Sequence, residues 1–177
     1  MKTKHIAVLL LALLSAGCTT TRITTVPAVR DAIFSTASHM VDDPSKMIAL
    51  EIRSSGTTAD ATFIRMSRMV GPSKLAKQVA SFLAKLEGQK ASLLLFGPNS
   101  SKTLRVAEDA LALSRGKELS KVTLLFYGDQ GDVVRLKDNA SEFKGTVLHV
   151  PQQSSPNKEL NPGKLGSGHA IGGQASK

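Results

Sequence analysis

The chain contains little cysteine and few aromatic residues. It has one Cys, one Tyr and no Trp, and aromatic residues make up 4% of its 177 positions. A single cysteine excludes a disulfide within the chain and a zinc site built from several thiolates. With so few aromatic rings the core has to be aliphatic, and stacking platforms for nucleic-acid bases are lacking. We therefore expect no nucleic-acid partner.

The N-terminal apolar run is too short to span a bilayer. It extends from Ile6 to Leu14, whereas a transmembrane helix needs about 20 apolar residues. Basic residues precede this run, and small residues follow it up to Cys18. This order is typical of a secretory signal with its cleavage site. Two alternatives are an uncleaved anchor helix and an ordinary secretory signal cut near Ala16 or Gly17, which would leave Cys18 as a free thiol.

Lys2, Lys4, the apolar run and Ser15-Ala16-Gly17-Cys18 together resemble the signal peptide and lipobox of bacterial lipoproteins. The resemblance implies that the Cys18 thiol receives fatty chains and that Cys18 becomes the first mature residue. Residue 19 is Thr rather than Asp, which in enteric-type lipoproteins implies the outer membrane. We therefore expect a lipid-anchored protein of the bacterial cell envelope that faces the periplasm.

The charge of the chain is strongly positive, with a formal value of +9. Removal of Lys2 and Lys4 with the signal would leave about +7 by the same count. Such a protein is attracted to anionic headgroups, to lipopolysaccharide and to other acidic polymers. The alternative is a solvated basic surface that serves solubility alone.

The composition divides the chain into four parts. Residues 18–44 carry the cysteine, a Thr-rich tether and a short helix over 27–41, and the Pro- and Gly-rich end has few apolar residues, which is typical of disorder. We expect a signal peptide over 1–17, this tether segment over 18–44, an α/β domain over 45–151 and a disordered tail over 152–177.

Apolar periodicity predicts the elements of that domain. Helical spacing predicts two main helices, over 72–87 and 101–114. Apolar or alternating runs predict strands over 47–53, 92–96, 122–127 and 146–150, and more weakly over 62–69 and 133–137. The strand–helix–strand unit over 92–127 has the length of a βαβ crossover. The expected fold is α/β, with the two helices on a small mixed sheet of four to five strands.

The segment that links the strand over 92–96 to the next helix resembles a phosphate-binding loop in part. It contains Gly97 and ends in Lys102-Thr103, but Ser101 replaces the second glycine of the P-loop pattern and Gly97 lies one residue too close to Lys102. Nucleotide binding is therefore not expected. Helix N-termini attract anions, so an anion contact at Ser100, Ser101 and Lys102 is a candidate, beside a capped helix start without a ligand.

Other polar residues form no strong catalytic or metal motif. Asp129 and Asp132 lie in a Gly-rich turn that lacks the ligand ladder of a calcium loop. A hydrolase site of Ser100, Asp129 and His149 has no Gly-x-Ser-x-Gly elbow to support it. We expect no enzyme activity, no cofactor and no metal.

Three functions remain as hypotheses. The first is a non-catalytic lipoprotein that helps to assemble an envelope machine for secretion, pili, conjugation or cell-wall synthesis. The second is a module that binds peptidoglycan, lipopolysaccharide or another anionic ligand. The βαβ unit is loosely similar to OmpA-like peptidoglycan-binding domains, but their Asp and Arg motif is not found here. The third, an envelope hydrolase, is the least supported.

Overall fold

The computed structural model describes residues 23–139 and 143–152. The expected signal peptide, the expected lipidation site Cys18 and residues 153–177 lie outside these ranges. Their assignments therefore remain predictions.

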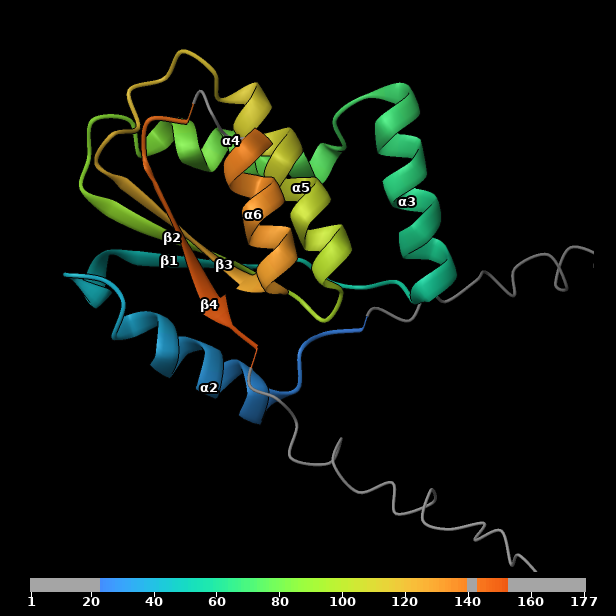
Figure 1. Ribbon diagram of the computed structural model, residues 1–177, viewed down its shortest axis with the longest axis horizontal. Coiled ribbons are helices and arrows are strands. Elements are labelled where there is room, and N and C mark those ends of the chain that lie inside the picture. Colours follow the sequence, from blue (N-terminus) through green and yellow to red (C-terminus); the bar gives the residue numbers. More distant parts are fainter. Residues whose placement is uncertain (1–22, 140–142, 153–177) are drawn as a thin grey trace, which may run out of the picture.

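A four-stranded sheet forms the centre of the molecule (Figure 1). Its strands are β1 (Met47–Glu51), β2 (Ala91–Phe96), β3 (Val122–Gly128) and β4 (Thr146–Pro151), and they lie side by side in chain order. All three pairings are parallel. Parallel neighbours require crossover connections, and helices supply each of them here. The carboxyl ends of the four strands consequently lie along one edge of the sheet.

Five α-helices surround the sheet among the described residues. They are α2 (Pro27–Ser38), α3 (Thr57–Val70), α4 (Lys74–Lys85), α5 (Ser100–Leu113) and α6 (Gln130–Asn139), and a single 3-10 turn, η1 (Pro44–Lys46), precedes β1. Both α3 and α4 lie between β1 and β2, whereas α5 and α6 each form one crossover. Figure 1 shows α2 on one side of the sheet and α4, α5 and α6 on the other, with α3 standing beside α5.

The two faces of the sheet bury two separate apolar clusters. On one face, Leu93, Leu95 and Phe126 pack against α4, α5 and α6. On the other, Leu94 and Leu125 pack against α2. Successive strand residues point to opposite faces, so the continuous apolar runs of β2 and β3 reflect a sheet covered on both sides.

The α/β fold is confirmed, but several details differ from the expectation. The sheet is parallel throughout rather than mixed, because both segments predicted weakly as strands are helical. Residues 62–69 belong to α3, and residues 133–137 belong to α6. The β-branched and aromatic residues of the first segment favoured a strand. In the second, Val133 and Leu136 are buried one helical turn apart against the core.

The chain is already ordered before α2, where a flexible tether was expected. Ile23 forms an antiparallel bridge with Ser54, with N–O distances of 2.8 and 2.9 Å. The Thr25 amide donates a hydrogen bond to the carboxylate of Glu51, which also pairs with Arg30 at 3.1 Å. These contacts fix residues 23–26 against the segment that follows β1.

Within the described ranges, none of the helices combines the length and apolar character that crossing a bilayer demands.

Candidate functional site

Helix α3 differs from the other crossover helices in what it buries. It begins after Gly56 and ends at Gly71, and both glycines have positive φ, a conformation that side chains with a Cβ rarely adopt. Its only fully buried residues are Asp60 and Ser67, which are both polar. Polar contacts with α5 therefore hold this helix, together with Phe63, which packs partly buried against the core.

The first of these contacts is a buried ion pair. Lys102, near the start of α5, places its Nζ 2.8 Å from Asp60 Oδ1 and 2.8 Å from the carbonyl oxygen of Arg53. The same ammonium lies 5.1 Å from the centroid of the Phe63 ring. The side chains of Lys102 and Asp60 are 8% and 0% exposed. This pair ties the first turn of α3 to α5 and to the end of β1.

Hydrogen bonds saturate the Asp60 carboxylate. Ser54 Oγ donates at 2.6 Å, the Ser55 amide at 3.0 Å and Asn99 Nδ2 at 3.0 Å. Burial raises the pKa of Asp60, but the hydrogen bonds from Lys102, Ser54 and Ser55 outweigh it and hold the pKa below its ordinary value of 3.8. Asp60 is therefore ionised at neutral pH and serves as the anionic centre of a structural network.

Arg105 forms the second contact between α3 and α5. Its Nε donates to Ser67 Oγ at 2.7 Å, and its Nη2 donates to the Ser67 carbonyl oxygen at 3.2 Å. Nη2 also lies 2.6 Å from Asp109 Oδ1. Burial raises the pKa of Asp109 above its ordinary value, although Arg105 opposes this effect. The Arg105 guanidinium is thus fully engaged in joining the two helices.

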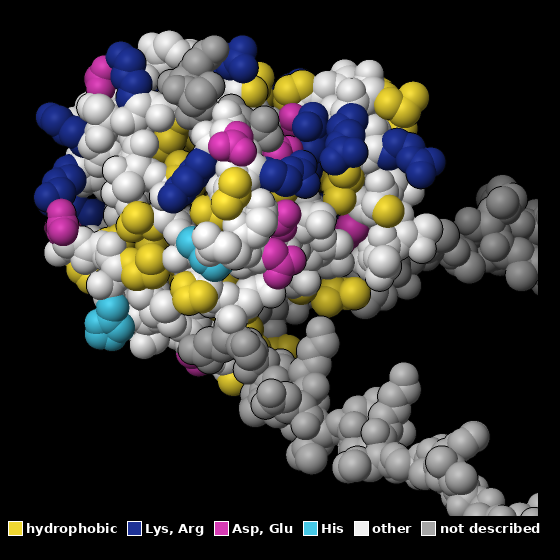
Figure 2. Space-filling model, viewed as in Figure 1, with side chains coloured by type: hydrophobic (Ala, Val, Ile, Leu, Met, Phe, Trp, Pro, Cys, Tyr) yellow, Lys and Arg dark blue, Asp and Glu magenta, His cyan; other side chains and the backbone are white. Residues whose placement is uncertain are grey.

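Above these contacts, α3, α5 and α6 enclose an open groove of about 540 Å³. We call it the arginine groove, because four arginines surround a partly apolar floor. The arginines are Arg65, Arg68, Arg105 and Arg135, and the remaining lining residues are Ala61, Ile64, Met69, Ser101, Leu104 and Glu108. Figure 2 shows Lys and Arg side chains gathered over this part of the molecule.

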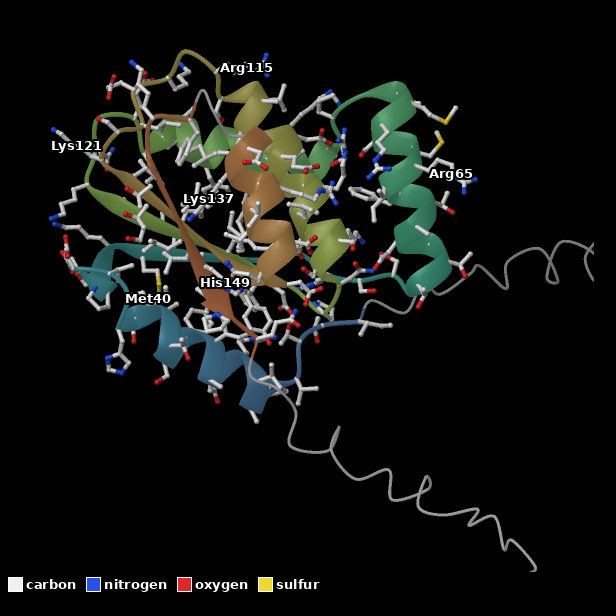
Figure 3. All side chains as sticks on the ribbon, viewed as in Figure 1. Met40, Arg65, Arg115, Lys121, Lys137 and His149 are labelled. Carbon is white, nitrogen blue, oxygen red and sulfur yellow. The ribbon has the colours of Figure 1, made fainter. Side chains whose placement is uncertain are left out.

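The charges in the groove do not balance. Glu108 pairs with Arg135 at 3.3 Å and with Arg105 at 3.7 Å, and Arg105 also pairs with Asp109. Four guanidinium groups thus face two carboxylates, which leaves two positive charges uncompensated. Within the described part of the chain, neither Arg65 nor Arg68 makes an ion pair or a side-chain hydrogen bond. Figure 3 shows Arg65 projecting from α3 away from the sheet.

Helix α3 also carries exposed apolar side chains. Met66, Met69 and Val70 are 50%, 75% and 77% exposed. Large apolar side chains that remain exposed beside a groove are typical of surfaces that bind another molecule, and Met adapts its shape to varied partners. The outer face of α3 therefore combines cationic and apolar groups.

The three residues predicted to contact an anion do not converge. Asn99 caps α5 by accepting a hydrogen bond from the Lys102 amide at 3.0 Å. The Lys102 ammonium is directed to Asp60, Ser100 Oγ donates to the carboxylate of Asp132, and Ser101 alone lines the arginine groove. An anion contact at this helix start stays a prediction, with the Lys102 charge already neutralised by Asp60.

A second polar group lies at the carboxyl edge of the sheet. Ser100 Oγ accepts a hydrogen bond from the Asp129 amide at 3.3 Å, and the ring nitrogen Nε2 of His149 lies 2.8 Å from the Gly128 carbonyl oxygen. The residues of the hydrolase hypothesis are thus near one edge, but His149 is bonded to backbone and Ser100 to Asp132. Among the described residues, no group of three His, Cys, Asp or Glu side chains is placed to hold a metal ion.

The arginine groove was not predicted from the sequence. Three helices contribute its cationic residues, and two of them, α3 and α6, were predicted in part as strands. A strand over 62–69 places Arg65 and Arg68 on opposite faces, whereas three-residue spacing on a helix places them on one face. That spacing was the available signal, and the helix assignment was needed to recognise it.

In comparisons with protein-family models, with curated proteins and with solved structures, no significant match to this chain was found.

Proposed function

We propose that the chain is a lipid-anchored, non-catalytic protein of the bacterial cell envelope that docks onto a partner protein through the arginine groove. In this proposal Cys18 carries the lipid, the lipid is inserted in the outer membrane, and the domain faces the periplasm. The partner belongs to an envelope machine for secretion, pili, conjugation or cell-wall synthesis. The observation that supports docking is α3, which the Lys102–Asp60 ion pair and the Arg105–Ser67 hydrogen bonds hold against α5. It nevertheless leaves Met69 exposed on the rim of the groove, and Met66 and Val70 exposed elsewhere on the helix.

The short link to Cys18 supports a role close to the bilayer. Residues 19–22 alone separate Cys18 from Ile23, which is fixed against Ser54. Five residue steps span at most roughly 17 Å. The nearby side chains of Ile23, Val26 and Val29 are also exposed and apolar. A domain on so short a link reaches only partners that approach the membrane surface.

Docking can be tested by photo-crosslinking in the cells that make the protein. A photoreactive amino acid at Met69, on the rim of the groove, is expected to join the chain to a second protein. The same group at His39, which is exposed at the end of α2 on the other side of the sheet, serves as the control. Equal yields from the two positions, or no product from Met69, would contradict docking at the groove.

Fractionation tests the anchor independently. We expect the wild-type chain to fractionate with outer membranes and Cys18→Ser to be released into the soluble periplasmic fraction, because the lipid attached to the Cys18 thiol is lost. A Cys18→Ser chain of mature size that remains in the outer-membrane fraction would eliminate the lipid anchor and leave the docking surface unaffected.

The unpaired guanidinium groups of Arg65 and Arg68 favour a second candidate function, which is binding of peptidoglycan, lipopolysaccharide or another anionic envelope polymer. Guanidinium groups bind phosphate and carboxylate with two parallel hydrogen bonds. Cosedimentation with purified sacculi and with lipopolysaccharide aggregates measures this activity. Retention that Arg65→Gln with Arg68→Gln abolishes would favour it over protein docking.

A further inference from the structure

The arginine groove has features that restrict what can occupy it. Its floor contains Ile64 and Leu104, and cationic side chains stand along its sides from both α3 and α6. An occupant therefore has to offer apolar groups to the floor and negative charge to the sides. Small inorganic anions satisfy only the second requirement.

The arginines of α3 that have no ion pair set the spacing that the carboxylates of a partner should have. Arg105 is engaged with Ser67 and Asp109, so Arg65 and Arg68 are the free cations of α3. Residues three apart on a helix lie about 5–6 Å from each other on one face. Two carboxylates one turn apart on a partner helix match this spacing.

The chain itself offers no suitable occupant. Its formal charge is +9, and residues 153–177 contain three lysines and one glutamate. A second copy or the C-terminal segment would therefore bring additional positive charge to a surface that already has an excess of it. Charge complementarity requires a different, acidic molecule.

Two observations favour a protein segment over a lipid or a polyphosphate. Glu108 lines the groove and would repel a multiply charged phosphate more strongly than a single carboxylate. The chain leaves toward Cys18 from Ile23, beside Ser54 and the first turn of α3. Arg68 lies eight residues beyond Asp60, roughly 12 Å farther along the helix. The groove thus extends away from the point nearest to the bilayer.

We infer that the arginine groove binds an acidic amphipathic helix of a partner protein. Apolar side chains of that helix sit against Ile64 and Met69, and its carboxylates pair with Arg65 and Arg68. Helix-in-groove binding of this kind uses anchors at helical spacing. This inference rests on the proposed docking function and specifies the chemistry of the partner.

The test uses the full-length chain in neutral detergent micelles and a labelled synthetic peptide. The peptide is an amphipathic helix with Leu on one face and Glu pairs three residues apart beside it. Two control peptides replace each Glu by Lys or scramble the sequence. Fluorescence anisotropy is expected to show saturable binding of the acidic peptide, at least about tenfold tighter than that of either control.

Matched variants locate the binding site. Arg65→Gln with Arg68→Gln is expected to weaken peptide binding about tenfold, because two exposed ion pairs are lost. Lys74→Gln with Lys77→Gln removes the same charge from α4, outside the groove, and is expected to change the affinity less than about twofold.

The inference is wrong if the acidic peptide does not bind saturably, or if the two double variants weaken its binding equally. It is also wrong if inorganic phosphate displaces the peptide more than chloride does at equal ionic strength. Crosslinking from Met69 in cells reports on docking separately. If it succeeds while the peptide does not bind, docking stands and the acidic helix is excluded.

Discussion

At the scale of single residues, the pair of Asp60 and Lys102 determines where α3 lies. The carboxylate accepts four hydrogen bonds, and the ammonium donates to both Asp60 and the Arg53 carbonyl oxygen. Each charge has its partner inside the protein, and neither side chain can turn to water without opening the contact between α3 and α5. The pair is therefore a structural element beneath the groove rather than a ligand site.

Removal of the ammonium should destabilise the fold strongly. Lys102→Met leaves the Asp60 carboxylate buried without its cation, and we expect the free energy of unfolding to fall by about 3–5 kcal/mol. Urea denaturation measures this loss. Lys117→Met is the control, because the Lys117–Glu87 pair is exposed and such pairs contribute about 0–1 kcal/mol. Similar losses in both variants would show that burial of the pair is unimportant.

The lowered pKa of Asp60 predicts a particular dependence of stability on pH. A carboxyl group whose pKa is lowered by folding stabilises the fold fully above its unfolded value, which is near 3.8 here, and this contribution is lost as the pH falls through the folded pKa. Asp60→Asn should therefore be less stable at pH 7. Its free energy of unfolding should also decrease less than that of the wild type on acidification below 3.8.

Asp109 provides a control of opposite sign for that experiment. Because burial raises the pKa of Asp109, its ionisation opposes folding as the pH rises above 3.8, and acid restores the stability lost. Asp109→Asn removes this gain, so its stability should decline more steeply with acid than that of the wild type. Urea titrations across the acid range compare the chains, and parallel curves would refute both assignments.

At the scale of elements, close packing of backbone segments limits what the loop after β2 can contain. A Cβ at Gly97 would lie 2.3 Å from the Ile52 carbonyl oxygen and 2.9 Å from Thr103 Oγ1. The first contact is with backbone, which cannot move without displacing the segment after β1. The glycine that resembled part of a phosphate loop is thus explained by the approach of two chain segments.

Alanine substitutions at Gly97 and Gly131 should therefore differ in their effect on stability. Gly97→Ala is expected to lower the free energy of unfolding by about 1–3 kcal/mol through overpacking. Gly131 lies in α6 with open space around it, and Gly131→Ala should leave stability unchanged or raise it by up to about 1 kcal/mol. Thermal or urea denaturation measures both, and a Gly97→Ala chain as stable as the wild type would disprove the steric argument.

The sequence predicted α4, α5 and the four strands, whose apolar patterns serve the core, whereas α6 was predicted as a strand although Val133 and Leu136 face the core. In α4, Val79 and Leu83 are buried at helical spacing, and β2 is a continuous buried run. Helix α3 gave a misleading pattern because only Phe63 among its large apolar side chains packs against the core, whereas Met66, Met69 and Val70 are exposed. Since no stripe of buried apolar residues marks α3 as a helix, its β-branched and aromatic residues dominated the prediction.

The candidate site could be recognised only from the three-dimensional structure. Residue type alone leaves both Asn99 and Ser100 as candidates for the cap of α5, and the structure shows that Asn99 is the cap. That Lys102 turns inward depends on Asp60, which lies 42 residues earlier in the chain and in a segment not predicted as a helix. The arginine groove likewise joins residues of three helices, and no local pattern relates Arg135 to Arg65.

At the scale of the whole molecule, the point of attachment constrains orientation. Ile23 is paired with Ser54, which follows the carboxyl end of β1, so the carboxyl edge of the sheet lies nearest to the proposed anchor. Lys121 immediately precedes the amino end of β3, a strand of seven residues that spans roughly 23 Å. The link of at most roughly 17 Å should therefore hold one edge of the sheet closer to the bilayer than the other.

Energy transfer to lipid can measure this orientation. Because Cys18 is the only cysteine of the chain and its thiol is blocked if lipidated, Val26→Cys and Lys121→Cys each offer one reactive thiol to a fluorophore. In vesicles that contain an acceptor-labelled lipid, the label at position 26 should transfer more energy than the label at position 121. Loss of both signals when Cys18→Ser is added would show that the acyl chains cause the proximity. Equal transfer from the two positions in the anchored chain would mean that the domain tumbles freely, and stronger transfer from position 121 would reverse the proposed orientation.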